Sequence, residues 1–474
     1  MKEKIASWLS NLANNPGSIL FYLLLVSIPS QFGRHFWPSF AFINGLRVDY
    51  LSPTLYVSDV LIGLLLVELL PFLMTKVSKV KILLVVLILG LFGYLSYTSL
   101  SPINSLFGLL RLFEIVVTTW FISHYLSLKK IKAHAQIVIS FSLVITMLLS
   151  VWQFVSQSSV GGLWYYLGER TFTSLTPGIA NASLAGNLVL RPYATFPHPN
   201  VLVAFSVVMV TFLLFSVRRK NKFTTIFIFT GVVSGVISAL LSMSRSGIAV
   251  LGLILFIWLI NLLRTSRKLF VGGISLIILA GIIIAITQSY LRFTDLHFSD
   301  ETIVIREFLL GHAYTLFLHH PLTGVGLQNF LPTLAKQISP LTPLSYFQPV
   351  HSVYFLILAE TGLLGTVLVI LLGILICIRI ARSKGERLVK SLLLLIVLLL
   401  SLTDHYFYTL HQGQLLLAFI LGVIFTQPTP LFTSLEAKNH RKSMRSHKTK
   451  KSLSSQPLKN SRTGTSSKTK PQLK

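Results

Sequence analysis

Two residues that can hold a charge and move a proton stand at the two ends of one polar stretch in the chain's second half. Arg306 opens this stretch, and His351 closes it just before a long apolar run. Arginine stays ionised and presents a planar fork to anionic groups. Histidine gains and loses a proton near neutral pH. The pair predicts a site in which a cation holds an anionic group while a base accepts a proton.

The segment between these two residues predicts a series of short local elements. An amphipathic helix that begins near Arg306 is expected to end at His320–Pro321. Gly324 and Gly326 then predict a turn. A proline-rich loop follows and delivers His351 to the mouth of the next apolar span. The segment from Arg306 to His351 would therefore place a cation and a base on the same side of a membrane.

Four more polar residues upstream are candidates for a site. Arg245 stands between two serines at the edge of an apolar run, where a charge needs a partner or must reach the interface. It is either such a topological arginine or a cation for an anionic ligand. Arg191 begins the sequence R-P-Y-A-T-F-P-H-P-N, in which His198 and Asn200 either cap the following apolar span or line a site.

Two sets of polar residues within apolar runs have structural explanations. Arg111 and Glu114 lie three residues apart, which permits a pair on one helix face. We interpret them as a structural pair in preference to a substrate contact. Glu360, Gly362 and Gly365, in the sequence A-E-T-G-L-L-G, indicate close packing of helices.

The sequence does not favour a metal or a disulfide. Asp295, His297, Asp300 and Glu301 could be metal ligands by type, but they are spread over a loop. The chain contains no D-x-D sequence, and we predict neither a metal nor another cofactor. The single cysteine, Cys377, lies in an apolar run, so no internal disulfide can form.

The composition is that of a membrane protein with many spans. Hydrophobic residues make up 53% of the 474 residues and charged residues only 12%, whereas a soluble protein carries about 25% charged residues. The mean hydropathy is +0.73. The formal net charge of +27 would suggest nucleic-acid binding in a soluble protein. Here the basic residues fall in short loops and a tail, so they indicate membrane topology, and no nucleic-acid partner is expected.

The apolar runs predict an all-α, polytopic helical bundle with about twelve transmembrane helices. Basic residues follow every even-numbered span, which places those loops and both termini in the cytoplasm. The two long loops, about 156–198 and 289–351, then face outward with the candidate residues. The last two spans are short and could instead form one re-entrant pair around Asp404–Gln414. The expected spans are near 18–33, 54–75, 82–98, 104–127, 135–155, 199–217, 223–241, 246–263, 269–288, 352–378, 391–405 and 410–426.

Several motifs in this order resemble the O-antigen ligase/O-antigen polymerase superfamily. They are R-E-x-L from Arg306, H-P-L-T-G-V-G-L-Q-N-F, H-S-V-Y-F-L-I-L-A-E-T-G-L-L-G from His351, R-P-Y-A-T-F-P-H-P-N from Arg191 and S-R-S-G around Arg245. The family-like core covers about residues 185–370. The resemblance implies a GT-C-like membrane glycosyltransferase domain over residues 1–432. The remaining tail, 433–474, is rich in Lys, Arg, Ser and Thr and poor in apolar residues, so its composition predicts a disordered basic cytoplasmic segment.

The resemblance also implies a reaction and roles for the candidate residues. The donor would be an undecaprenyl-diphosphate-linked glycan, and the acceptor a hydroxyl of a glycan, lipid or protein. His351 would deprotonate the acceptor, while Arg245 and Arg306 stabilise the departing diphosphate. Substrate-binding residues would be Arg191, His198 and Asn200. Transfer would invert the anomeric centre, need no metal and take place at the outer face of the cytoplasmic membrane.

The competing interpretation is a transporter or flippase for a lipid-linked glycan or a charged solute. The number of spans and the intramembrane Arg111 and Glu114 are compatible with transport. Transporters, however, usually carry internal repeats with paired broken helices, and the sequence shows no such repeat. The long outward loops that carry arginine and histidine also favour an enzyme.

Overall fold

The computed structural model describes residues 16–76, 79–184, 187–216, 222–265, 301–383 and 386–427. The expected span near 269–288, the residues Asp295, His297 and Asp300, and the tail 433–474 lie outside these ranges. The described residues up to Thr426 belong to one compact unit.

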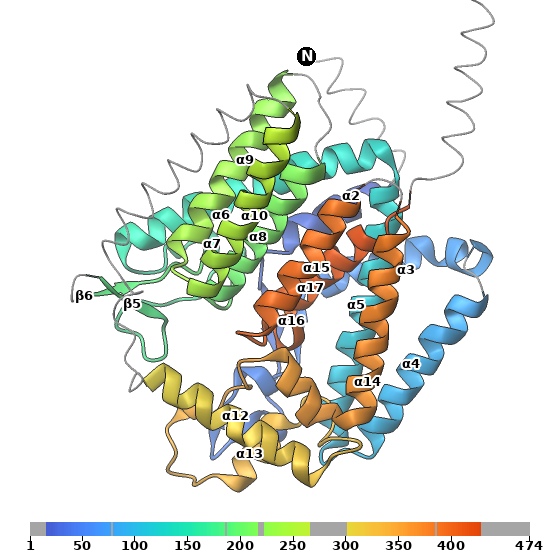
Figure 1. The fold of residues 1–474 in the computed structure, drawn as a ribbon. Coiled ribbons are helices and arrows are strands. Elements are labelled where there is room, and N and C mark those ends of the chain that lie inside the picture. The colour runs from blue at the N-terminus through green and yellow to red at the C-terminus, as the bar shows by residue number, and fades with distance from the viewer. Residues whose placement is uncertain are drawn as a thin grey trace, which may run out of the picture. The chain divides into compact units, whose positions relative to one another are not determined.

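Helices make up most of this unit (Figure 1). The short helices α7 (Leu163–Tyr166) and α16 (Tyr406–Thr409) accompany the longer ones. The longer helices are α2 (Pro16–Ser27), α3 (Val57–Lys76), α4 (Lys79–Tyr97), α5 (Pro102–Ser127), α6 (Lys129–Ser156), α8 (Pro199–Ser216), α9 (Lys222–Leu241), α10 (Arg245–Thr265), α12 (Glu301–His319), α13 (Phe330–Gln337), α14 (Val353–Ala381), α15 (Arg387–Ser401) and α17 (His411–Phe425).

Six helices of the described residues are long and apolar enough to cross a membrane, namely α5, α6, α8, α9, α10 and α14. Three shorter apolar helices, Pro16–Ser27, Val85–Tyr97 and His411–Phe425, accompany them. The prediction of a helical membrane protein is confirmed. The count of twelve spans remains a prediction; two of the remaining expected spans, near 54–75 and 391–405, fall on α3 and α15.

The burial of α8 and α14 differs because of their places in the bundle. Nearly every residue of α8 is buried, since this helix packs against α9, α10, α15 and α17. The outer part of α14 exposes apolar residues such as Ile370 and Leu375, which are 56% and 59% exposed. A helix that is apolar all round suits either a bundle centre or a lipid-facing position. In a membrane, this part of α14 would face lipid.

Small two-stranded antiparallel sheets add to the helices, so the described chain is not purely helical. Strand β1 (Gly33–His35) pairs with β4 (Thr54–Tyr56), β2 (Phe42–Ile43) with β3 (Leu46–Arg47), and β5 (Asn181–Leu184) with β6 (Asn187–Leu190). The β2–β3 turn is Asn44–Gly45, with φ values of 51° and 78°. Asn-Gly is the pair that favours a tight hairpin turn of this kind. These sheets lie in the polar segments between helices.

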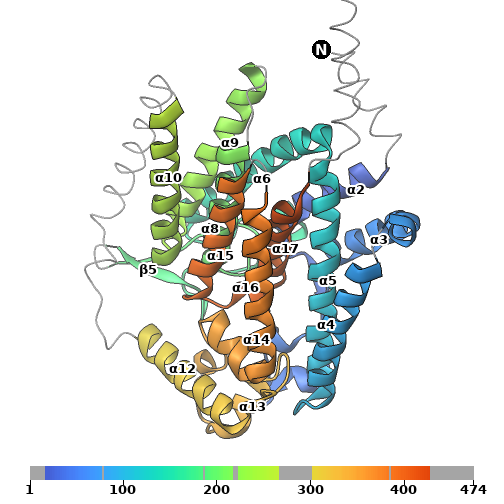
Figure 2. The same ribbon diagram turned by 45° about the vertical axis from the view of Figure 1, so that its right-hand side comes forward.

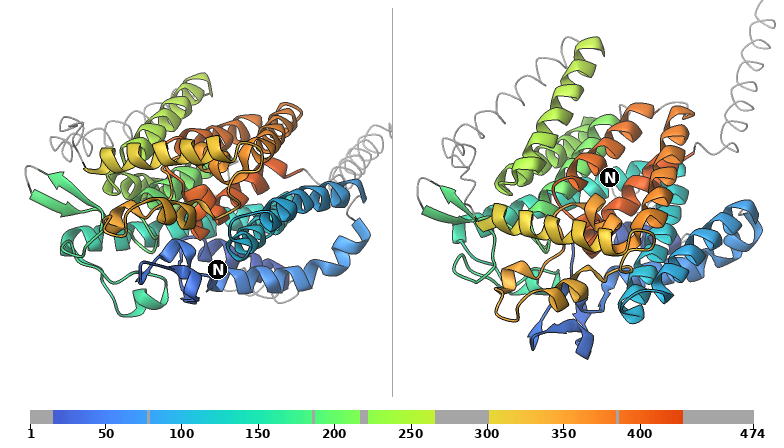
Figure 3. Two further views of the ribbon diagram at one scale, coloured as in Figure 1. Left: turned by 90° about the horizontal axis from the view of Figure 1, so that it is seen from below. Right: turned by 60° about the horizontal axis from the view of Figure 1, so that its bottom comes forward.

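The turn after α12 is joined to α14 by backbone hydrogen bonds. Figure 3 shows α12 running across α14, and the two helices are in contact. The backbone N–H of Gly326 donates to the carbonyl of Glu360 at 2.8 Å, and Leu363 N–H donates to the carbonyl of Pro321 at 2.8 Å. The helix is kinked at Gly362, whose φ of 57° and ψ of −159° are open almost only to glycine. Two of the sequence motifs therefore meet as a hydrogen-bonded joint.

The buried side chain of Glu360 stabilises the same joint through hydrogen bonds. Its side chain is 3% exposed and accepts hydrogen bonds from the backbone N–H groups of Gln328 at 2.8 Å and Phe330 at 3.1 Å. The hydroxyl of Tyr408 donates to it at 2.7 Å. Close helix packing alone does not explain this residue, because it links the α12–α13 turn, α14 and α16. The joint holds the first turns of α14, and with them His351, in place.

Candidate functional site

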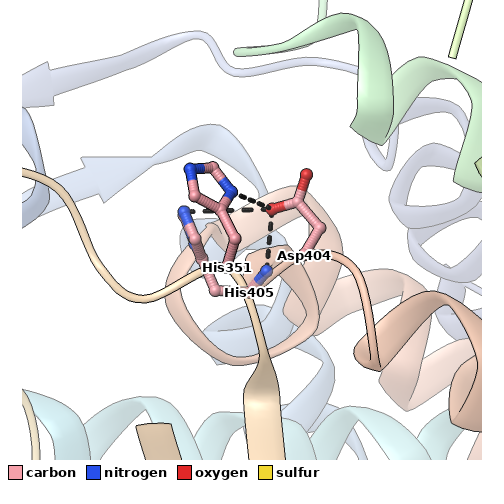
Figure 4. Close-up of side chains that lie close together, drawn as sticks. All are labelled: His351, Asp404 and His405. Atoms are coloured by element: carbon pink, nitrogen blue, oxygen red, sulfur yellow. Dashed lines mark hydrogen bonds and ion pairs between the residues drawn. The ribbon is translucent and has the colours of Figure 1, made fainter. Parts of the chain in front are cut away.

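His351 lies just before α14, and its ring is close to the carboxylate of Asp404 (Figure 4). Its Nε2 is 3.2 Å from the side-chain oxygen of Gln348. The amide nitrogen of Gln348 donates to the carbonyl of Ser345 at 2.7 Å, which turns the amide oxygen toward the ring. On the other side, the ring's Nδ1 lies 3.8 Å from Oδ1 of Asp404. At 3.8 Å the carboxylate is within ion-pair distance, but the buried Nδ1 makes no hydrogen bond among the described residues.

Asp404 comes from the connection between α15 and α16 and is only 6% exposed. Its Oδ1 accepts the backbone N–H of His405 at 2.7 Å, and its Oδ2 accepts the side-chain amide of Asn200 at 2.6 Å. Burial raises the pKa of this carboxyl, but the hydrogen-bonding and electrostatic effects of His351 and the nearby His405 and His198 outweigh it and lower the pKa well below its usual range. Asp404 is therefore an ionised carboxylate that faces His351.

A second layer of hydrogen bonds positions Asp404. Asn200, in the first turn of α8, accepts a hydrogen bond from Nη2 of Arg191 at 2.9 Å. Arg191 follows β6, is 7% exposed and donates its Nε to the carbonyl of Ser242 at 2.9 Å. Arg191, Asn200, Asp404 and His351 thus form a chain of polar contacts that joins three separate segments. The sequence placed Arg191 and Asn200 at the site as substrate ligands, and here both contact protein groups.

His198 starts the turn into α8. Its Nδ1 accepts the backbone N–H of Asn200 at 3.1 Å, which requires that nitrogen to be unprotonated. Burial lowers the pKa of His198 to about 3, with a further contribution from the charge of Arg191. This histidine is consequently a neutral acceptor that begins the helix.

Arg245 and Arg306 remain outside this chain of contacts. Arg245 is the first residue of α10, and its buried Nε has no hydrogen-bond partner among the described residues. Arg306 is exposed on α12. Its charge contributes to the low pKa of His405, about 3, of which burial is the main cause. Arg306 therefore acts electrostatically on the same cluster, and both guanidinium groups have donors to offer a ligand.

Residues 230–370 match the family model described as O-Antigen ligase. This match bears out the resemblance of the chain to the O-antigen ligase/polymerase superfamily. The matched ligase segment contains Arg245, Arg306 and His351, whereas Arg191 and Asp404 lie outside it. No curated protein sequence matches the chain.

The match to the O-antigen ligase model, together with the apolar helices, supports two coarser conclusions about the protein. It is a membrane protein, and its activity is of the glycosyltransferase type found in O-antigen ligases and polymerases. The resemblance of the motifs to this superfamily is confirmed. The residue roles within the ligase segment stay predictions.

One set of possible metal ligands among the described residues includes His351. Ligand atoms of His351, Asp404 and His405 lie within 4.8 Å of one another. Two imidazoles and a carboxylate are a set that transition metals accept. Both carboxylate oxygens of Asp404 already accept hydrogen bonds from protein groups. The expectation of a metal-free reaction remains a prediction that chelation tests.

Asp404 and His405 are the residues that the sequence analysis missed. They lie in a polar interval between two apolar runs, which was considered only as a re-entrant pair. The sequence D-H-Y between two short spans was the available signal, because a carboxylate at a span's end needs a partner. Its partner could not be named, since the contact with His351 joins distant parts of the chain.

Proposed function

We propose that this protein is a glycosyltransferase of the cytoplasmic membrane that transfers a glycan from an undecaprenyl-diphosphate-linked donor to an acceptor hydroxyl. The reaction would take place at the outer face, invert the anomeric centre and need no metal. The observation that carries the proposal is the placement of His351, within the ligase segment, between Gln348 and the buried carboxylate of Asp404.

In the proposed step, His351 is the general base. With the Nδ1 proton turned toward Asp404, the ring exchanges its contact with Gln348 for one with the acceptor hydroxyl, and Nε2 takes the hydroxyl proton. The hydroxyl oxygen then bonds to the anomeric carbon while the bond from that carbon to the diphosphate oxygen breaks. The carboxylate of Asp404 balances the positive charge that the ring acquires, as a buried carboxylate does for a catalytic imidazole elsewhere.

Arg245 and Arg306 would neutralise the departing undecaprenyl diphosphate. Neither makes an ion pair with a described carboxylate, and guanidinium groups bind phosphate oxygens through paired hydrogen bonds. Such preorganised cations lower the barrier because they act where negative charge develops. Arg191 would act through Asn200, which holds Asp404 in place, and His198 would line the substrate cavity.

The proposal also includes the membrane topology, the extent of the enzyme domain and a role for the basic tail. Both termini would be cytoplasmic, with the segments 156–198 and 289–351 facing outward. The transmembrane enzyme domain would cover residues 1–432. The basic tail, 433–474, would contact anionic lipid at the cytoplasmic face.

The decisive experiment reconstitutes the purified protein in sealed proteoliposomes with its undecaprenyl-diphosphate-linked glycan and candidate acceptors. We expect the release of undecaprenyl diphosphate together with a glycosylated acceptor. A transporter or flippase would instead move the intact donor between leaflets without forming either product. Movement of intact donor, with no product for any acceptor, would contradict the proposal.

A further inference from the structure

A cavity of about 770 Å³ lies among the β1–β4 sheet, α3, α5 and the start of α17. Ligand pockets in proteins typically measure about 300–1,000 Å³. The lining includes His198 and Gln348, and Gln348 contacts His351 directly. The cavity therefore reaches a residue that contacts the proposed base. Figure 2 shows α4 and α5 on one side of α14–α17 and α10, which begins with Arg245, on the other.

A second polar cluster, formed by Asp59, Arg111, Glu114 and His411, lines this cavity. Arg111 donates to the two oxygens of Asp59 at 2.9 and 3.2 Å and also contacts Glu114. The same guanidinium donates to Nδ1 of His411 at 3.3 Å. The expected Arg111–Glu114 pair is thus part of a larger network contributed by three helices. The structural interpretation explains the pairing but not why the network lines a cavity.

Stacking and hydrogen bonds hold the cluster in place, and its polar side chains are still partly exposed to the cavity. The ring of Tyr56 stacks on His411 with centroids 4.1 Å apart, and the hydroxyl of Ser58 lies 2.6 Å from Nε2 of His411. The side chains of Arg111, Asp59 and Glu114 retain 21%, 16% and 13% exposure. Such preorganised groups can meet a ligand without paying the entropy of ordering long side chains.

Two lining residues have unused hydrogen-bonding capacity. Oε1 of Glu114 and the amide nitrogen of Gln31 are buried without a hydrogen-bond partner among the described residues. One is an acceptor and the other a donor, and a hydroxyl can serve both. The ring of Tyr165, which is 54% exposed, also lines the cavity. Hydroxyl-binding groups and an exposed aromatic ring in one cavity suit a sugar, which has polar hydroxyls and apolar C–H faces.

The charges of the lining disfavour a phosphate or a metal ion. Four carboxylates line the cavity against two guanidinium groups, those of Arg111 and Arg170. Arg111 is paired as described, and Arg170 lies 3.9 Å from Asp49. Atoms of Asp59, Glu114 and His411 lie close enough together for a metal. The guanidinium of Arg111, however, contacts all three side chains, and its charge would repel a cation.

We infer that Asp59, Arg111, Glu114, His411 and Tyr165 form a sugar-binding subsite that holds one neutral or amino-substituted sugar of a glycan reacting at His351. The inference rests on the proposed function for the identity of that glycan. The sugar belongs to either the donor or the acceptor glycan, because both present hydroxyl-rich rings to this cavity.

The test uses the full chain in nanodiscs and three probes. The probes are the lipid-linked glycan extracted from cells that make this protein, the oligosaccharide released from that glycan by mild acid, and undecaprenyl diphosphate alone. Glu114→Gln replaces one carboxyl oxygen with an NH₂ group that cannot accept a hydrogen bond, so affinity for the sugar should fall by up to about tenfold. Tyr165→Ala, on an exposed side chain, should weaken sugar binding without affecting folding. Binding of undecaprenyl diphosphate alone should not change.

Two readouts separate the sources of the sugar. A donor sugar predicts weaker binding of the lipid-linked glycan and of the released oligosaccharide in both variants. An acceptor sugar predicts unchanged donor binding but a KM for the acceptor raised by about tenfold. The matched control is Glu68→Gln on α3, outside the cavity lining, where the carboxylate accepts a hydrogen bond from Tyr125. This control should leave both values unchanged.

Unchanged sugar binding and unchanged acceptor KM in both Glu114→Gln and Tyr165→Ala would overturn the subsite. The binding measurement does not depend on the proposed transfer activity, because binding of the released oligosaccharide needs no turnover. If wild-type protein transfers glycan while the variants behave like the Glu68→Gln control, the subsite fails and the proposed function stands.

Discussion

Replacement of Gly362 by alanine should weaken the joint between α14 and the turn after α12 and so destabilise the protein. The new Cβ would lie 2.5 Å from the carbonyl carbon and oxygen of Leu322 and 2.7 Å from the backbone nitrogen of Gly324. These atoms are backbone, so they cannot rotate away. The backbone conformation at φ 57° and ψ −159° adds a cost of about 1–3 kcal/mol for any residue but glycine.

The expected loss of stability follows from these two effects together. The conformational cost, plus the loss of one or two hydrogen bonds such as Leu363 N–H to Pro321 O, at about 1 kcal/mol each, gives roughly 3 kcal/mol. For a protein of this size we expect the midpoint of thermal unfolding to fall by roughly 3 °C. Glycan transfer should fall as well, because the joint positions the start of α14 and His351.

Gly373→Ala supplies a matched control in the same helix. No atom lies within 4 Å of the Cβ that this substitution adds. Alanine in a helix interior is favoured over glycine by about 1 kcal/mol, so this variant should be as stable as the wild type or slightly more so. Thermal unfolding of both proteins in the same detergent is the assay. Equal midpoints for Gly362→Ala and Gly373→Ala would refute the account of the joint.

Three other predictions address the metal, the pH dependence and the topology. Transfer should survive EDTA; if chelation abolishes it and a divalent ion restores it, the set of His351, Asp404 and His405 is the first suspect. His198 has a folded pKa of about 3 against 6.5 when unfolded, so stability is complete above pH 6.5 and falls as the pH drops toward 3. The loss is about 2 kcal/mol at pH 5, and His198→Asn, which keeps an acceptor for the helix start, should flatten the pH profile of thermal unfolding between pH 7 and 5. Reporter fusions at Lys220, outside the described residues, and at Lys336 should report opposite sides of the membrane, and the same side for both would rule out the proposed topology.

The sequence was informative where a physical requirement acts locally. A span must be long and apolar, so the helices α5, α6, α8 and α9 were visible as runs of about twenty apolar residues. The end of α12 was visible at Pro321 because proline cannot continue a helix. The order of the motifs was enough to identify the superfamily.

The parts that escaped prediction depend on contacts between distant segments. Asp404 becomes a partner of His351 only when α15 and α14 lie together, and no periodicity encodes that arrangement. Asp59 joins Arg111 in the same way across α3 and α5. The sheets were missed for another reason. Their strands are two to four residues long, which is too short for an alternating pattern to stand out.

In the proposed mechanism, His351 moves the acceptor proton while Arg245 and Arg306 hold the diphosphate. The most direct test measures donor affinity and turnover separately in nanodiscs for His351→Ala, Arg245→Ala and Arg306→Ala, with His319→Ala, an exposed histidine at the end of α12, as the control. His351→Ala should lose about 10²–10⁴-fold in turnover while binding the donor normally. The arginine variants should bind the donor more weakly, and lysine should not fully replace arginine. Near wild-type turnover in His351→Ala, or unchanged donor affinity in both arginine variants, would contradict the claim.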